Sequence, residues 1–308
     1  MNLKKPNYWD KQIGLISIIL LPVTLIVLII IFLKKKLTKS KKFNIPIVCI
    51  GNIYIGGTGK TPTSILLANE LSKLRRKPAI IRKYYKDHID EYNLIKNNAQ
   101  SLITNENRIE ALKEAEISNF DIAILDDGLQ DYRIKKNLSI VCFNYNQLIG
   151  NGLVLPSGPL RENLLALKNA DIVIINGAKN INFENKILNI NKKLEIFYSH
   201  YKPINLDQFK DKKLFAIAGI GNPKNFFQLI EQNNLKIEKK LTFPDHYKFS
   251  KTEIQKIINE AKNNNCQIIM TEKDYFKINH YNLKEANYLK VSLAINEIGK
   301  LINRINKI

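Results

Sequence analysis

The stretch that decides the fold of this chain follows directly after the apolar run Ile45–Ile50 and reads Gly51-Asn52-Ile53-Tyr54-Ile55-Gly56-Gly57-Thr58-Gly59-Lys60-Thr61-Pro62. A strand that leads into a glycine-rich turn and then into Gly-Lys-Thr is typical of a phosphate-binding loop. Glycine lets backbone N–H groups close around phosphate oxygens, and the next helix points the positive end of its dipole at the same anion. The stretch therefore predicts nucleotide triphosphate chemistry.

The last residues of this loop have individual roles in such sites. We expect Lys60 to reach the β- and γ-phosphates and the Thr61 hydroxyl to ligate Mg²⁺. The strict pattern requires glycine at the position that Tyr54 occupies. The alternative is a glycine-rich turn that binds no ligand, but packing alone does not explain why Lys-Thr stands at the start of the helix. We expect nucleotide contacts from Tyr54, Ile55, Gly56, Gly57, Thr58, Gly59, Lys60 and Thr61.

Composition sets limits on the class of protein. The chain has 308 residues, enough for two domains, and a formal net charge of +20. Such a charge suits nucleic acid, an anionic membrane face or an acidic substrate. There is no named nucleic-acid motif, so we expect no nucleic-acid partner. The three cysteines, Cys49, Cys142 and Cys266, lie in apolar runs, which predicts buried thiols in a reducing compartment.

A membrane segment is predicted near the N-terminus. Ile13–Leu33 carries no charged residue and, as a helix, would be about 31 Å long, near the thickness of a bilayer core. Lysines follow within Lys34–Lys42, and the positive-inside rule puts that basic flank and the rest of the chain in the cytoplasm. The sequence leaves open whether the helix spans the bilayer or bends at Pro22 and lies in one leaflet. A buried helix of a soluble protein is the alternative.

Beyond this segment, short apolar runs alternate with helical stretches, which favours an α/β fold with a parallel sheet and crossover helices. The expected strands are Ile45–Ile50, Pro78–Ile81, Phe120–Leu125, Leu138–Phe143, Asp171–Ile175, Leu214–Ala218, Gln267–Thr271 and Tyr288–Val291. The expected helices are Thr61–Arg76, Arg108–Glu116, Pro223–Gln232, Lys251–Asn263 and Asn296–Ile308. We divide the chain into an anchor with its basic flank (1–36), a P-loop kinase domain (37–199) and a smaller C-terminal α/β domain (200–308).

Two carboxylates, Asp126 and Asp127, end the apolar strand Phe120–Leu125. In phosphate-loop enzymes the acid at such a strand end holds Mg²⁺ directly or through water. Crossover topology brings strand ends to one edge of the sheet, beside the loop. A polar strand end that enters a turn is the alternative reading.

Three further polar groups are candidates for the site. Glu162 could complete a Mg²⁺ shell, and Arg161 could stabilise transferred phosphoryl charge, although a surface turn with a helix-start ion pair explains both. His246, after Asp245, could orient a catalytic carboxylate, although a lone histidine is more often structural. Thr271-Glu272-Lys273-Asp274 is first of all a helix-capping box.

Taken in order, these segments resemble the tetraacyldisaccharide 4'-kinases, the lipid A 4'-kinases of Gram-negative bacteria. The matching motifs are Gly51-Asn52 with Gly56–Pro62, Asp126–Gln130 with Tyr132-Arg133, Gly150–Gly152, Leu155-Pro156, Gly158-Pro159, Arg161-Glu162, Asn176-Gly177, Ala218–Pro223 with Phe226-Phe227, Asp245-His246 and Thr271–Asp274. The resemblance covers nearly the whole chain after the N-terminal segment, and such a segment also fits the family.

The resemblance implies two α/β/α domains and ATP- and Mg²⁺-dependent phosphorylation of the 4'-hydroxyl of a lipid A disaccharide 1-phosphate, giving lipid IVA. It implies the inner membrane as location, with catalytic domains on the cytoplasmic face and membrane lipids as partners of the N-terminal helix and its basic flank. It also places Gln130 among the nucleotide contacts. In the family an aspartate of a Gly-Asp-Glu-Pro motif pairs with the histidine of the Asp-His motif to activate the hydroxyl.

This chain departs from the family in the segment that carries the aspartate. Arg82-Lys83-Tyr84-Tyr85 stands where the family has Arg-Gly-Tyr-Gly, and the following segment is shorter. Asp90, in Asp90-Glu91-Tyr92, is the best match to the family aspartate and is our candidate general base, with His246 in support.

We therefore predict a membrane-anchored lipid A 4'-kinase. The runner-up is a membrane-anchored P-loop ATPase or GTPase without a lipid acceptor, which would hydrolyse nucleotide rapidly without lipid. A third class is a nucleotide-switch adaptor, which would bind nucleotide tightly and form no product.

Overall fold

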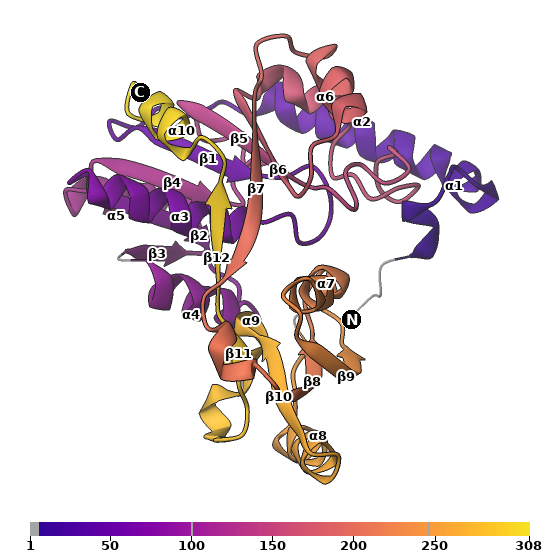
Figure 1. The fold of residues 1–308 in the computed structure, drawn as a ribbon. Coiled ribbons are helices and arrows are strands. Elements are labelled where there is room, and N and C mark those ends of the chain that lie inside the picture. Colours follow the sequence, from indigo (N-terminus) through magenta and orange to yellow (C-terminus); the bar gives the residue numbers. More distant parts are fainter. Residues whose placement is uncertain (1–5, 100, 246) are drawn as a thin grey trace. The chain divides into compact units, whose positions relative to one another are not determined.

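The computed structural model describes residues 6–99, 101–245 and 247–308, and its chain divides into two compact units (Figure 1). The eight-strand unit holds the described residues up to Tyr84 together with Ala99–His200 and Ala294–Ile308. The four-strand unit holds Tyr85–Asn98 and Tyr201–Leu293. The chain passes from the eight-strand unit to the four-strand unit between His200 and Tyr201, one residue from the predicted domain boundary between residues 199 and 200. Each unit also takes a segment from the other half of the chain.

The eight-stranded sheet has the order β12-β7-β6-β5-β1-β4-β2-β3, and the pairings from β7 to β3 are parallel. Its strands are β1 (Ile47–Gly51), β2 (Pro78–Lys83), β3 (Leu102–Asn105), β4 (Ile122–Asp126), β5 (Leu138–Asn144), β6 (Ile172–Asn176), β7 (Glu195–Pro203) and β12 (Val291–Ile295). β7 and β12 each continue from one unit into the other. The prediction of an α/β fold with a P-loop-type parallel sheet is confirmed.

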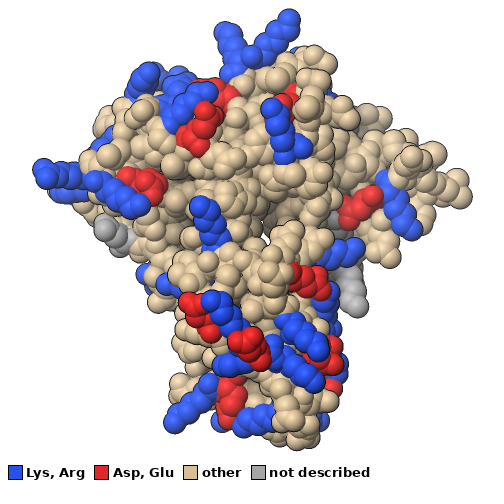
Figure 2. All heavy atoms as spheres, in the orientation of Figure 1, with Lys and Arg blue, Asp and Glu red and all other residues tan. Residues whose placement is uncertain are grey.

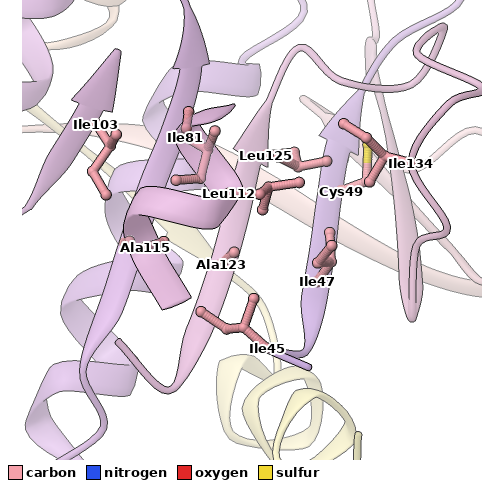
Figure 3. Close-up of a cluster of buried hydrophobic side chains, with 12 residues drawn as sticks. Ile45, Ile47, Cys49, Ile81, Ile103, Leu112, Ala115, Ala123, Leu125 and Ile134 are labelled. Carbon is pink, nitrogen blue, oxygen red and sulfur yellow. The ribbon is translucent and has the colours of Figure 1, made fainter. Parts of the chain in front are cut away.

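Both faces of the central strands β1, β2, β4, β5 and β6 are buried, which explains why these strands read as continuous apolar runs. On one face, alternate residues of β1 to β4 pack against α5 (Arg108–Ile117), as the cluster in Figure 3 shows. The intervening residues, such as Val48, Ile80 and Ile124, are also fully buried. The helix α3 (Lys60–Lys73) packs on β1, β2 and β4, and the same unit contains α6 (Ile181–Leu188) and α10 (Ile298–Ile305). The three cysteines are buried and free, as predicted.

The four-strand unit contains a second parallel sheet with the order β11-β10-β8-β9. Its strands are β8 (Lys213–Ala218), β9 (Lys236–Thr242), β10 (Cys266–Thr271) and β11 (Tyr288–Leu289). Its helices are α4 (Ile89–Asn98), α7 (Pro223–Gln232), α8 (Lys251–Asn263) and α9 (Glu272–Ile278). Because α4 packs on α9, a segment from the first third of the chain becomes part of this unit.

The excess of basic residues is dispersed on the face drawn in Figure 2, where acidic side chains lie between several of the lysines and arginines. Ion pairs of this kind occur in the four-strand unit: Lys240 lies 2.5 Å from Glu231, and Lys262 lies 2.8 Å from Glu285. Part of the positive charge of the chain thus lies beside negative charge.

The segment Ile13–Leu33, predicted to form a membrane helix, is not one continuous helix. The segment forms α1 (Leu15–Ile19) and α2 (Leu21–Leu37), which meet at Leu20. Pro22 lies in the first turn of α2; it has no N–H, and its ring would clash with the preceding turn of a continuous helix. In the part of the chain that the structure describes, no helix is both long and apolar enough to cross a membrane.

One side of this helix pair is attached to the rest of the eight-strand unit. Thr24 Oγ1 lies 2.8 Å from Ser157 Oγ and accepts a hydrogen bond from the Ser157 backbone N–H at 3.2 Å. Asn151 Nδ2 donates to Ser17 Oγ at 3.2 Å. The polar residues that interrupt the apolar segment are thus its buried attachment points. The large apolar side chains that α1 and α2 leave exposed are Leu15, Ile16, Ile18, Ile19, Leu21, Val23, Leu25, Ile26, Ile29, Ile30, Phe32, Leu33 and Leu37.

Candidate active site

The glycine-rich loop joins β1 to α3, and two of its positions favour glycine. Gly56 has φ 123° and Gly59 has φ 90°, so a side chain at either position would be strained. Asn52 supports the loop from its start, since its Nδ2 donates to the backbone oxygens of Tyr54 and Gly56 at 2.6 and 3.2 Å. The loop ends at the N-terminus of a 14-residue helix, the arrangement that binds phosphate.

Tyr54 is the residue that departs from the strict loop pattern, and its side chain turns away from the loop into the protein. The ring is fully buried, packed with Val154, Leu160 and apolar side chains of α2. Its hydroxyl donates to Asp10 Oδ1 at 2.8 Å, and burial together with this hydrogen bond raises the pKa of Tyr54. Any nucleotide contact at this position is therefore left to the backbone.

A short pairing brings the Arg161 segment beside the loop. The backbone N–H of Ile55 donates to Pro159 O at 2.9 Å, and the N–H of Arg161 donates to Ile53 O at 2.7 Å. In this structure the Ile55 N–H therefore bonds to protein, so its predicted contact with nucleotide stays a prediction.

The Thr61 hydroxyl lies where α3 begins and meets the end of β4. It donates to Asp126 Oδ2 at 3.0 Å, and Ser64 Oγ donates to Asp126 Oδ1 at 3.2 Å. Arg82, at the end of β2, donates to the same carboxylate and lies 3.1 Å from Thr61 Oγ1. The parallel register explains this meeting, because it pairs Arg82 directly with Asp126. Asp126 is fully buried, so Arg82 compensates a charge that has left water.

Asp127 carries the second strand-end carboxylate and lies between two cations. Arg161 Nη1 is 3.0 and 3.2 Å from its two oxygens, and Lys60 Nζ is 3.7 Å from Oδ1. Burial by itself would raise the pKa of Asp127, but Lys60 and Arg161 outweigh it and hold the pKa well below its usual range. Burial lowers the pKa of Lys60, and Asp127 partly offsets that.

The backbone at Asp127 is held in a left-handed conformation, with φ 58°. Its N–H donates to Ile50 O at 2.9 Å, and Arg108 Nη2 donates to its carbonyl at 2.7 Å. Residues in this region of backbone space cost free energy unless their surroundings hold them, and they cluster at functional sites. The contacts from β1 and α5 supply that support.

Glu162 is buried beside the loop, and Gln130 connects the two. Gln130 Nε2 donates to Asn52 O at 3.0 Å and to Glu162 Oε1 at 3.1 Å. Burial and a hydrogen bond to Glu162 raise the pKa of Tyr132. The arrangement gives Gln130 a bracing role next to the loop. Its predicted contact with nucleotide remains a prediction.

The candidate Mg²⁺ ligands are oxygen donors, as this hard cation requires. Thr61 and Asp126 are already in contact, and Asp127 follows in the chain. In the described ranges no three acidic, histidine or cysteine side chains form a preassembled metal site. That is compatible with Mg²⁺, which is usually held by one or two carboxylates together with substrate phosphates and water.

In the four-strand unit, Asp90 lies in the first turn of α4 and is almost fully buried. Lys273, on α9, lies 3.6 Å from Asp90 Oδ2. His246, the predicted partner of Asp90, lies outside the described residues.

The sequence reasoning did not include Arg82 and Ser64 in the site. Arginine at the end of an otherwise apolar strand was the available signal, because parallel register brings strand ends together. Ser64 lies one helical turn after Lys60, so its contact with Asp126 followed from helix geometry.

A parallel sheet with a glycine-rich loop, and with cations and paired carboxylates at the ends of its central strands, defines a P-loop protein of the nucleotide-dependent phosphotransferase class. Within that class the chain belongs to the LpxK family, the tetraacyldisaccharide-1-P 4'-kinases, whose model matches residues 16–308. The prediction of a 4'-kinase of a lipid A precursor is thereby confirmed. The alternative of a hydrolase without a lipid acceptor is not favoured.

Similar proteins agree with this family. A tetraacyldisaccharide 4'-kinase from Pelagibacter ubique is 43% identical over 100% of this chain and 99% of its own length. One from Francisella tularensis subsp. novicida is 33% identical over 94% of this chain and 98% of its own length. The crystal structure of LpxK from Aquifex aeolicus in complex with ATP matches with a TM-score of 0.72, covering 95% of this chain and 99% of that one. At 21% identity this last match shows the shared fold.

Proposed function

We propose that this chain transfers the γ-phosphoryl group of ATP to the 4'-hydroxyl of a tetraacyldisaccharide 1-phosphate, with Mg²⁺ as cofactor. The hydroxyl oxygen attacks the γ-phosphorus, the bond to the β–γ bridging oxygen breaks, ADP leaves, and the hydroxyl proton passes to a base. The observation that carries the proposal is the contact of Lys60 and Arg161 with Asp127, and of Thr61 with Asp126, beside one glycine-rich loop.

The roles of the site residues follow from what phosphoryl transfer requires, which is positioning and neutralisation of charge. Lys60 and Arg161 bind the phosphates, and their contacts with Asp127 give way when phosphate oxygens arrive. Thr61 and Asp126 would hold Mg²⁺, with Asp127 and Glu162 contributing directly or through water. When bound, Mg²⁺ neutralises charge on the β- and γ-phosphates. Asp90 accepts the hydroxyl proton, and His246 supports it.

The exposed apolar sides of α1 and α2 support contact with a membrane surface. An apolar surface as continuous as this one marks an interaction site on a soluble protein, and the acceptor lipid resides in a bilayer. We propose that the helix pair lies in one leaflet of the bacterial inner membrane, with the basic flank Lys34–Lys42 toward anionic headgroups and both units on the cytoplasmic side.

The test of this function is transfer of labelled γ-phosphate from ATP and Mg²⁺ to tetraacyldisaccharide 1-phosphate in detergent. We expect labelled bisphosphorylated lipid from the wild type and a loss of at least about 10²-fold for Lys60→Ala, the scale for a lost transition-state contact. Lys73→Ala is the matched control, because Lys73 is an exposed lysine on the same helix.

Two results would contradict the proposal. Labelled free phosphate without labelled lipid would favour the hydrolase. Near-normal transfer by Lys60→Ala would remove the role assigned to the phosphate loop.

A further inference from the structure

Lys273 lies among three carboxylates of the four-strand unit. Its Nζ is 3.6 Å from Asp90 Oδ2, 3.0 Å from Glu91 Oε1 and 3.1 Å from Asp245 Oδ1. Asp90 and Glu91 lie at the start of α4, Asp245 follows β9, and Lys273 itself is on α9. One ammonium group thus joins three segments that are far apart in the sequence.

The cluster is shielded from water to different degrees. The side chain of Asp90 is 3% exposed, those of Lys273 and Glu91 are each 15% exposed, and that of Asp245 is 35% exposed. A buried carboxylate is costly unless a cation or hydrogen bonds compensate it. Lys273 supplies positive charge where the chain gathers three acidic groups, and Asp90 is the most buried of the three.

The capping motif explains why Lys273 is held firmly in this place. Thr271 Oγ1 accepts a hydrogen bond from the Asp274 N–H at 3.1 Å, and Asp274 Oδ2 accepts one from the Gly219 N–H at 2.8 Å. These bonds fix the first turn of α9 on the end of β8. Asn98, at the far end of α4, donates to Glu272 Oε1 at 3.1 Å. The helix α4 is therefore tied to α9 at both ends, once through Lys273 and once through Glu272.

We propose that Lys273 is a positioning residue for Asp90, which keeps the Asp90 carboxylate charged and oriented for the proton that it accepts. The proposal rests on the proposed function, in which Asp90 is the general base. Lys273 acts through Asp90 and does not touch the substrates. The four residues Thr271–Asp274 then have two tasks, since Thr271 and Asp274 fix the start of α9 while Glu272 and Lys273 fix α4.

The test compares Lys273→Met, which keeps the length of the side chain and removes its charge, with Lys273→Arg, which keeps the charge. We expect Lys273→Met to lower kcat of lipid phosphorylation by about 10- to 100-fold, within the range of a weakened general base. The KM values for ATP and lipid should stay within about twofold, because an effect through Asp90 leaves ground-state binding unchanged. Lys273→Arg should recover most of kcat.

A double-substitution cycle separates positioning from a general effect on folding. Asp90→Ala should lower kcat by at least about 10²-fold, and Lys273→Met should add almost nothing in that background, because Lys273 then has no base to position. Lys248→Met is the matched control: Lys248 pairs with Asp87 in the same unit, but both side chains are exposed, so we expect wild-type kcat. If Lys273→Met does not fold, Lys273→Met combined with Glu91→Gln removes a negative charge together with the positive one and serves in its place.

Each outcome distinguishes between possible roles of Lys273 and Asp90. Wild-type kcat in Lys273→Met, or an equal further loss in the Asp90→Ala background, would overturn the proposal. A raised KM with unchanged kcat would also overturn it and make Lys273 a phosphate-binding residue. Wild-type kcat in Asp90→Ala would show that Asp90 is not the general base. The error would then lie in the role proposed for Asp90 in catalysis.

Discussion

Arg82 and Asp126 form a buried ion pair between neighbouring strand ends, and this pair gives a prediction at the scale of single residues. Arg82→Met leaves the fully buried Asp126 without its cation. Breaking such a pair on one side costs about 3–5 kcal/mol. For a unit of this size we expect the midpoint of thermal unfolding to fall by more than about 6 °C.

Lys113→Met is the control for this measurement. Lys113 also pairs with an acidic residue of the eight-strand unit, Glu110, but the two side chains are 45% and 49% exposed. An exposed pair contributes at most about 1 kcal/mol. Equal shifts in the two variants would show that Arg82 does not compensate a buried charge.

From the sequence, a residue could be assigned to the candidate site where its chemistry is local to a motif. Lys60 and Thr61 follow from the loop, and Asp126 and Asp127 from a strand that ends in carboxylates. The contacts of Arg82 and Lys273 with acidic residues were not predicted, because their partners are 44 and 183 residues away. Only the register of the sheet and the packing of α4 on α9 bring these residues to the acids.

At the scale of elements, the polar residues in the apolar N-terminal segment are its points of attachment. Thr24→Val keeps the shape of the side chain but leaves the backbone N–H of Ser157 without the hydroxyl that accepts its hydrogen bond. The loss of a buried hydrogen-bond partner costs about 1–3 kcal/mol. We therefore expect faster amide hydrogen exchange over α2, which reports local opening.

Thr38→Val is the matched control at the other end of α2, where the threonine hydroxyl is exposed and bonds to Lys34 O within the same helix. Its effect should stay within about 0.5 kcal/mol. Unchanged exchange in Thr24→Val would mean that apolar contacts alone hold α2 to the unit.

Some strands and helices could be predicted from the sequence, and others could not. The strands β1, β4, β5 and β6 were predicted because strands buried on both faces give continuous apolar runs. The strands β3 and β9 and the helix α4 were missed, since β3 has four residues and β9 is mostly exposed and rich in lysine. The helix α4 is polar in sequence, and its buried side appears only when α9 is present to cover it.

At the scale of the whole molecule, the exposed sides of α1 and α2 should decide where the protein resides. Ile26 and Ile30 are each 57% exposed on α2. We expect Ile26→Asp with Ile30→Asp to weaken binding to vesicles that contain anionic lipid by at least about 10-fold, because charge enters the apolar surface. Sedimentation with the vesicles measures this binding.

Ile117→Asp serves as the control, since Ile117 is 81% exposed at the end of α5, and its substitution should leave vesicle binding unchanged. Raising the salt concentration should weaken binding of the wild type in part, through the basic flank, and leave the apolar contribution in place. If the protein with Ile26→Asp and Ile30→Asp bound vesicles as strongly as the Ile117→Asp control, the membrane contact would have to lie on another surface.

The packing of α4 on α9 also has a consequence for how the chain matures on the ribosome. Asn98 and Glu272, which join these helices, are 174 residues apart in the sequence. At a synthesis rate of about 5–20 residues per second, α4 is synthesised roughly 9–35 s before its partner helix. The segment that carries Asp90 therefore waits undocked while the nucleotide loop is already made. This segment becomes ordered only when translation is almost complete, so a nascent or truncated chain would have the loop without a docked α4.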